Sequence, residues 1–271
     1  MRVRTWNIDS MTGMLQYDRE FAIVDSFGEA LRLSSHPKLT LIEPRIDIDK
    51  QLLIVNAPSC QELVIDITRR EGTVSYERDI NICGSACSST PWGNIEISDW
   101  FSSYLGVPCW LARYKNISAT ILNTPHYAFA NEAPILLISQ ESVSILNRAL
   151  KQQSFPNAST KHFRPNLVVH SVSISSISED HANPEDSWIS LRISRSGISF
   201  CVSGKCNRCS MVDIDPLSGM KGQTLKTLAQ YRRNRGNITF GVFLSLDQDN
   251  SHSHVTDWTI HEGDNILVTI T

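Results

Sequence analysis

Residues 200–219 read Phe-Cys-Val-Ser-Gly-Lys-Cys-Asn-Arg-Cys-Ser-Met-Val-Asp-Ile-Asp-Pro-Leu-Ser-Gly, and this segment holds three of the chain's seven cysteines. Cys206 and Cys209 form a C-x-x-C motif with Arg208 between them. A guanidinium group beside a thiol favours the ionised sulfur, which is the form that binds metals and attacks electrophiles. The apolar run 211–214 that follows predicts a short strand, closed by a turn at Asp215-Pro216. The thiol pair is therefore expected at the start of a strand.

The composition is that of a globular protein, with 41% hydrophobic and 20% charged residues in a chain of 271. A net charge of −3 argues against general affinity for nucleic acid or anionic lipid, so no nucleic-acid or membrane partner is expected. The sequence shows neither an apolar run of the roughly 20 residues that a membrane helix needs nor the apolar core of a secretory signal. An odd number of scattered cysteines then predicts reduced thiols and a cytoplasmic location.

The first part of the chain, to about Cys109, predicts mostly strands. β-Branched runs spaced roughly ten residues apart, with turn residues between them, are typical of an antiparallel barrel or sandwich rather than of βαβ units. The predicted strands are 21–25, 39–42, 52–55, 63–67 and 73–76. Apolar side chains recur at helical spacing from Ile97 to Leu105, so this segment predicts a helix that Gly106 ends.

Residues 110–128 interrupt the strand pattern and predict the joint between two domains, residues 1–115 and 116–271. In the second domain, Ser139 is expected to cap a helix that reaches Leu150, and another helix is expected from Thr224 to Arg235. Polar residues 171–187 predict a surface loop. Further strands are predicted at 134–138, 167–169, 239–244 and 265–270. The expected fold class is mainly β, with a few short helices.

The C-x-x-C motif alone is compatible with several functions of the two thiols. A structural zinc site would need two more ligands, and the nearest other cysteines, Cys83 and Cys87, have the looser C-x3-C spacing. A thioredoxin-like redox pair opens a helix within a βαβ unit, whereas this pair stands between strand-like runs. Unligated thiols in a barrel core remain equally compatible with the motif by itself.

A second polar segment, Phe163-Arg164-Pro165-Asn166, leads into the predicted strand 167–169. Arginine's fork suits a phosphate and the asparagine amide suits a flat hydrogen-bonding heterocycle, although a surface arginine and a turn asparagine fit the spacing as well. Arg19, before the strand at 21–25, is another arginine at a strand start, within a cluster of charged residues.

Taken in order, these pieces resemble the MOSC family, and most closely the branch formed by the C-terminal regions of eukaryotic molybdenum cofactor sulfurases. The mitochondrial amidoxime-reducing proteins are the next most similar branch. The resemblance implies an N-terminal MOSC β-barrel domain followed by a MOSC domain. It is carried by Tyr17-Asp18-Arg19, Leu41-Ile42-Glu43-Pro44, Asn131-Glu132-Ala133, Phe163-Arg164-Pro165-Asn166, Trp188, Cys206-x-Arg208-Cys209, Asp215-Pro216, Gly219, Tyr231-Arg232 and Phe240-Gly241.

Carried over residue by residue, the resemblance implies that Cys209 is both the molybdenum ligand and the catalytic residue. A soft sulfur ligand suits a dithiolene-bound metal. Cys206 could relay a persulfide, although a structural thiol is the preferred interpretation. The residues that the resemblance assigns to the cofactor are Arg19, Asn131, Arg164, Asn166, Asn207, Arg208 and Phe243, the last in place of a tyrosine.

The resemblance implies a function in sulfur transfer to the molybdenum cofactor (Mo-molybdopterin). A desulfurase domain or partner using pyridoxal phosphate, which is not part of this sequence, would supply the sulfur, and xanthine dehydrogenase and aldehyde oxidase would receive the sulfurated cofactor. The alternatives are a molybdenum-dependent reductase of N-hydroxylated compounds and a non-enzymatic cofactor carrier. The family also has a cofactor-contacting Lys-Ser segment before the equivalent of Arg2, where this sequence begins.

Overall fold

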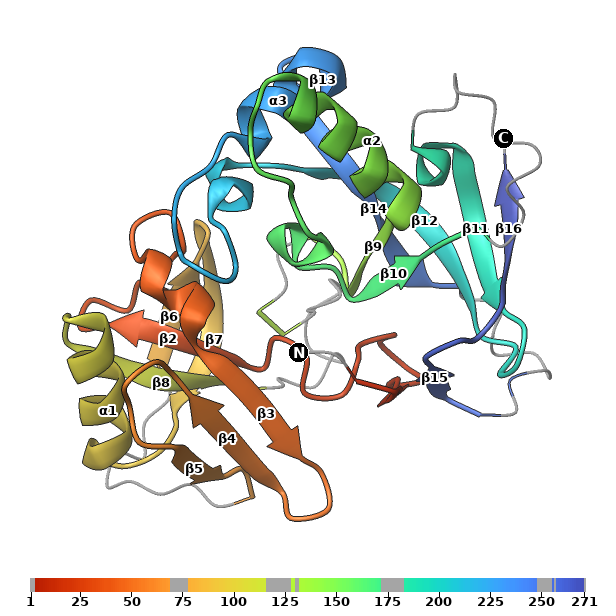
Figure 1. The fold of residues 1–271 in the computed structure, drawn as a ribbon. Coiled ribbons are helices and arrows are strands. Elements are labelled where there is room, and N and C mark those ends of the chain that lie inside the picture. The colour runs from red at the N-terminus through yellow and green to blue at the C-terminus, as the bar shows by residue number, and fades with distance from the viewer. Residues whose placement is uncertain are drawn as a thin grey trace. The chain divides into compact units, whose positions relative to one another are not determined.

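The computed structural model describes residues 3–68, 78–115, 128–129, 132–171, 183–247, 255 and 257–270. The chain folds into two compact units, one made of residues 1–2, 17–131 and 217–219 and the other of residues 3–16, 132–216 and 220–271. Strands dominate both units (Figure 1), which confirms the mainly-β prediction. The domain boundary predicted at residues 115 and 116 stays a prediction, because residues 116–127 lie outside the described ranges.

The first unit contains a four-stranded antiparallel sheet in the order β2-β8-β7-β6 and a three-stranded sheet in the order β3-β4-β5. Its strands are β2 (Phe21–Asp25), β3 (Glu43–Asp47), β4 (Leu52–Asn56), β5 (Leu63–Asp66), β6 (Arg78–Ile82), β7 (Ser85–Pro91) and β8 (Cys109–Tyr114). The strand predicted at 39–42 is wrong, because the 3-10 helix η1 (Pro37–Leu41) occupies this segment. Proline's fixed φ suits a first helical turn, and its missing N–H weakens a strand ladder. The strand predicted at 73–76 lies outside the described residues.

Helix α1 (Ile95–Leu105) confirms the helical periodicity read from the sequence. It begins where the Asn94 side chain accepts a hydrogen bond from the Ile97 N–H at 3.2 Å, and it ends at Gly106, whose φ of 76° is left-handed. Its apolar stripe is buried against the strands of the same unit, next to β8.

The second unit is built on one curved sheet in the order β10-β9-β14-β12-β11-β16, in which the β9–β10 pair is parallel and the others are antiparallel. Its strands are β9 (Ile135–Ser139), β10 (Leu167–Val169), β11 (Trp188–Ile193), β12 (Ser199–Asn207), β14 (Asn237–Leu246) and β16 (Ile266–Ile270). The short β13 (Arg233–Asn234) pairs with β14, and β1 (Thr5–Asn7) pairs with β15 (Thr259–His261). The helical elements are α2 (Gln140–Gln152), α3 (Thr224–Arg232), η2 (Thr160–Phe163), η4 (Pro184–Ser187) and η5 (Ser210–Asp213).

Helices α2 and α3 lie together along one face of this sheet (Figure 1). The strand β9 is buried on both faces, which explains why its sequence is an uninterrupted apolar run. Ile138 packs under the helices with Val143 and Leu146, whereas Ile135 and Leu137 belong to the core on the opposite face. The Ser139 side chain caps α2 by accepting from the Ser142 N–H, as the sequence predicted.

Two bulges interrupt the pairing of β12 with β14. Val202 pairs with Leu244 and Gly204 with Phe243, so β12 carries one extra residue there; Lys205 then pairs with Val242 and Asn207 with Thr239, so β14 carries the next. In the second bulge, Phe240 and Gly241 stand opposite Cys206 alone. Phe240 packs with the helices while Val242, two residues on, packs in the opposite core, because the bulge reverses the alternation of the strand.

Three further predictions for the second unit are corrected by the structure. The run 211–214 is not a strand, because residues 210–213 form η5. Helix α3 ends at Arg232 rather than Arg235, since the chain turns at Arg235 and Gly236, both with positive φ, into the β13–β14 hairpin. Within the segment predicted as a polar surface loop, Glu185 of η4 is fully buried.

We expect Gly241→Ala to lower the free energy of unfolding by about 3 kcal/mol, because φ is left-handed and the new methyl group has no room. A Cβ at Gly241, where φ is +75°, would lie 2.6 Å from Ile138 Cγ2 and 2.7 Å from the Leu137 carbonyl oxygen. Gly204→Ala is the matched control in the facing strand, since nothing lies within 4 Å of its Cβ position. Urea unfolding of both variants measures the difference, and equal losses would contradict the steric argument.

Candidate functional site

The C-x-x-C motif lies at the end of β12, not at the start of a strand as the sequence indicated. Cys206 is buried, with 6% of its surface exposed, and its thiol contacts the Asn207 carbonyl oxygen at 3.6 Å. Cys209 is exposed and stands at the N-cap position of η5, where its carbonyl accepts from the Val212 N–H at 3.2 Å. Of this pair, Cys209 is the thiol that a ligand can reach.

Arg208 forms a tie between two backbone segments. Its Nε and Nη2 donate to the Phe240 carbonyl oxygen at 2.8 and 2.6 Å, and its Nη1 donates to the Phe163 carbonyl oxygen at 3.1 Å. The guanidinium also lies over the Phe163 ring, 5.3 Å from its centroid, and that ring stacks on Phe240 at 4.2 Å. Arg208 therefore holds the segment that carries Cys209 to the segment that carries Arg164, a structural role that the motif spacing did not indicate.

Arg164 and Asn166 are set up differently although they are two residues apart. Arg164 is exposed and has a left-handed φ of 53° at the end of η2. Asn166 donates its N–H to the Leu136 carbonyl oxygen at 2.8 Å, and its side-chain Oδ1 accepts from the Leu136 N–H at 2.9 Å. Its amide side chain thus imitates a backbone group and extends the β9–β10 pairing by one residue.

The other predicted site residues belong to different elements of the chain. Asn207 is exposed at the end of β12, opposite Thr239, and Phe243 is half-buried in β14 between Gly204 and Leu136. Arg19 belongs to the first unit, where it pairs with Asp18. Asn131 lies outside the described residues.

A buried histidine that sequence reasoning did not select links two parts of the site. His162 Nδ1 accepts from the Ser159 N–H at 3.1 Å, and its Nε2 lies 3.8 Å from Asp215 Oδ2. Burial lowers the pKa of His162 below 6.5, and this effect outweighs the nearby carboxylates of Asp215 and Asp213. The buried ring therefore lies between η2, which leads to Arg164, and the turn after η5. Its only sequence signal was its place directly before Phe163-Arg164.

Within the described ranges, no group of three or more histidine, cysteine, aspartate or glutamate side chains could hold a metal ion. Among the helices in the described part of the chain, none is both long and apolar enough to span a membrane.

The MOSC domain model matches residues 124–267 and the MOSC N-terminal beta barrel domain model matches residues 2–108. The chain therefore belongs to the MOSC family, as the sequence resemblance predicted.

Three relatives are each named molybdenum cofactor sulfurase. The protein of Aspergillus niger is 29% identical over 92% of this chain and 37% of its own length. The protein of Oryza sativa subsp. japonica is 31% identical over 90% of this chain and 30% of its own length. That of Solanum lycopersicum is 32% identical over 98% of this chain and 33% of its own length. The chain thus spans about a third of the length of these relatives. A solution structure from Bordetella bronchiseptica aligns with 36% of this chain and 74% of its own at 19% identity, with a TM-score of 0.31 that is too low to establish a common fold.

Replacing Arg208 with lysine tests the tie between Phe163 and Phe240. A lysine ammonium gathers its donors on one nitrogen and lacks the planar fork whose three nitrogens reach the Phe163 and Phe240 carbonyl oxygens. An unpaired carbonyl costs roughly 1–3 kcal/mol, so we expect Arg208→Lys to destabilise the protein by about 2 kcal/mol. Arg148→Lys, an exposed arginine on α2, is the control and should change stability by less than about 0.5 kcal/mol. Denaturant unfolding compares the two, and equal stabilities would refute the tie.

The lowered pKa of His162 predicts a pH dependence of stability. Because the folded state binds this proton less readily than the unfolded state, the contribution is complete above pH 6.5 and is lost as the pH falls through the folded-state pKa. We expect His162→Gln to flatten the stability profile as the pH falls below 6.5, and His36→Gln, at a partly exposed position, is the comparison variant. Thermal unfolding across this range provides the measurement, and an unchanged slope in His162→Gln would rule out the assignment.

Proposed function

We propose that this chain binds the molybdenum cofactor through Cys209 and takes part in its sulfuration. The observation that carries the proposal is the division of the C-x-x-C pair into one exposed thiol at a strand end and one buried thiol. Family membership and the names of the relatives support the choice of cofactor. The activity, partners and substrates of those longer proteins are part of the proposal.

The residues present fit such a cofactor. A thiolate is a soft ligand and suits molybdenum held by sulfur atoms, and the part of the chain that the structure describes offers no cluster of hard ligands that would compete for the metal. Arg164, exposed at a fixed turn, can meet the cofactor's phosphate, and Asn207 can donate hydrogen bonds to the pterin. Arg19, Asn131, Asn166 and Phe243 are proposed as further contacts on the strength of the resemblance alone.

Each side chain then has a distinct task. Cys209 holds the metal, and Arg208 fixes the loop on which Cys209 stands by binding the Phe163 and Phe240 carbonyl oxygens. Cys206 is too buried to receive sulfur from a protein partner, so we assign it to packing. Bound in this way, the cofactor would supply the molybdenum centre that accepts sulfur.

The sulfur donor in this proposal is a cysteine desulfurase, as a domain or as a separate protein, that works with pyridoxal phosphate. The chain would then be the cofactor-holding part of a molybdenum cofactor sulfurtransferase. Xanthine dehydrogenase and aldehyde oxidase are the proposed recipients of the sulfurated cofactor. All of these steps require an accessible residue 209.

The test is molybdenum retention by cysteine variants purified from a host that makes the cofactor. We expect Cys209→Ala to lose retention by roughly tenfold or more because the ligand is gone, while Cys206→Ala keeps most of it. Elemental analysis with pterin fluorescence measures both, and circular dichroism confirms that each variant is folded. Equal retention by the two variants would end the assignment of Cys209 as the ligand.

A further inference from the structure

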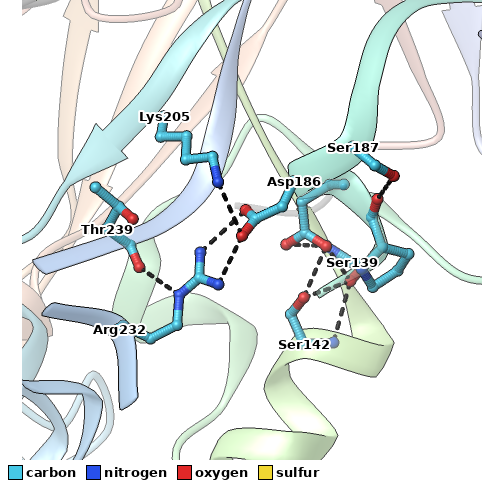
Figure 2. Close-up of polar contacts among 9 residues, drawn as sticks. Ser139, Ser142, Asp186, Ser187, Lys205, Arg232 and Thr239 are labelled. Carbon is cyan, nitrogen blue, oxygen red and sulfur yellow. Dashed lines mark hydrogen bonds and ion pairs between the residues drawn. The ribbon is translucent and has the colours of Figure 1, made fainter. Parts of the chain in front are cut away.

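A network of charged side chains lies beside the second bulge and contacts both of its strands. Asp186 of η4 accepts from Arg232 Nη1 and Nη2 at 2.6 and 3.0 Å and from Lys205 Nζ at 3.1 Å (Figure 2). Arg232 also donates from Nε to the Thr239 carbonyl oxygen at 2.8 Å. The carboxylate thus connects η4 to β12, to the end of α3 and, through Arg232, to β14.

Two different arginines bind the carbonyl group of the bulge residue Phe240 and that of the preceding residue, Thr239. Arg232 binds the Thr239 carbonyl oxygen and Arg208 binds that of Phe240, the next residue. On the facing strand, Lys205 is the residue directly before Cys206. Asp186 therefore contacts β12 directly, and β14 through Arg232, next to Cys206, which stands three residues before the exposed Cys209.

The element that carries Asp186 is itself fixed. The neighbouring Glu185 is fully buried, and its Oε2 accepts from the hydroxyl groups of Ser139 and Ser142 at 2.6 and 2.7 Å. These serines form the N-terminal end of α2, where a carboxylate is favoured by the helix dipole (Figure 2 shows both serines beside η4). The turn η4 is thus held to a helix on one side while it holds the bulge on the other.

The Asp186 and Arg232 side chains are largely buried, and each charged group of this network is paired with a group of opposite charge. The Arg232 side chain is 9% exposed and that of Asp186 is 19% exposed. Burial alone would raise the pKa of Asp186, but the hydrogen bonds and charges of Arg232 and Lys205 outweigh it and lower the pKa. Removing the carboxylate would leave a nearly buried guanidinium without its counter-charge, which is strongly unfavourable.

We propose that Asp186 and Arg232 are positioning residues for Cys209: they fix the β14 bulge and the end of β12, and so the direction in which the exposed thiol projects. The consequence for cofactor affinity rests on the proposed function, whereas the local ordering of residues 206–209 does not. Neither residue has to touch the cofactor for this role.

The test uses Asp186→Asn and Arg232→Lys in the full chain, with Asp264→Asn as the control. Asp264 accepts from Arg195 Nε at 3.1 Å and from the His261 N–H at 2.8 Å, so its loss also removes a buried carboxylate, but in the turn between β15 and β16. Arg232→Lys keeps the positive charge but lacks the fork that reaches Asp186 and Thr239 together. The melting temperature of each variant is measured first.

The first readout is amide hydrogen exchange. We expect exchange at residues 206–209 to accelerate about tenfold or more in Asp186→Asn and Arg232→Lys, while β9 amides change little, since the opening is local. Acceleration of all amides to the same extent, or the same acceleration at 206–209 in Asp264→Asn, would overturn the proposal.

The second readout is molybdenum retention, compared with Asp264→Asn at a similar loss of melting temperature. Reduced retention in the two test variants alone supports positioning, and equal retention in all three contradicts its effect on the cofactor. If the wild-type chain retains no molybdenum, the proposed function fails, and the exchange result still decides whether Asp186 and Arg232 order residues 206–209.

Discussion

The second unit depends on the hydrogen bonds that the Arg208 guanidinium gives to the Phe240 and Phe163 carbonyl oxygens. A bulge in a buried strand leaves a carbonyl group without its ladder partner, and a buried carbonyl without a partner destabilises the fold by a few kcal/mol. Arginine can correct this because its donors are spread over a rigid plane. The same side chain that completes the sheet also fixes the chain on either side of the reachable thiol.

The bulge then determines how the two cores of the unit are divided. Because it reverses the alternation of β14, Phe240 packs beneath α2 and α3 while Val242 and Leu244 fill the other face. The glycine at 241 is required by both its φ and the closeness of Ile138 and Leu137. The same few residues therefore set the packing, the backbone conformation and the position of Cys209. A substitution at any of these residues should alter all three.

Much of the fold could be predicted from the sequence because periodicity and capping are local. The stripe from Ile97 to Leu105, the cap at Ser139 and the buried run of β9 all formed as expected. The predictions failed where one residue fits two local structures. Pro37 starts a 3-10 helix at a position where a strand was expected, and Gly236 forms the turn of a hairpin instead of ending a helix. Pairing between distant strands decides such cases, and single-sequence patterns do not contain it.

The site was predictable in its residue types and less so in its contacts. The motif indicated reactive thiols but not which of Cys206 and Cys209 is exposed, because that depends on a bulge in another strand. Arg208 was expected to support the thiolate, yet the carbonyl oxygens it binds come from segments 32 and 45 residues away in sequence. Arg232 belongs to the Tyr231-Arg232 pair that carries the family resemblance, but the sequence did not indicate its contact with Asp186, because that contact forms only when η4, α3 and the sheet are assembled.

The paired bulges of β12 and β14 also bear on how this sheet can change during evolution. The extra residue in β12 shifts the register by one and the extra residue in β14 shifts it back, so the strands leave the region in the alignment with which they entered. Losing either residue alone would displace everything downstream, including the thiols. Related proteins should therefore either keep both extra residues or lose both. In an alignment of related sequences, gaps at residue 203 and at residues 240–241 should then occur together.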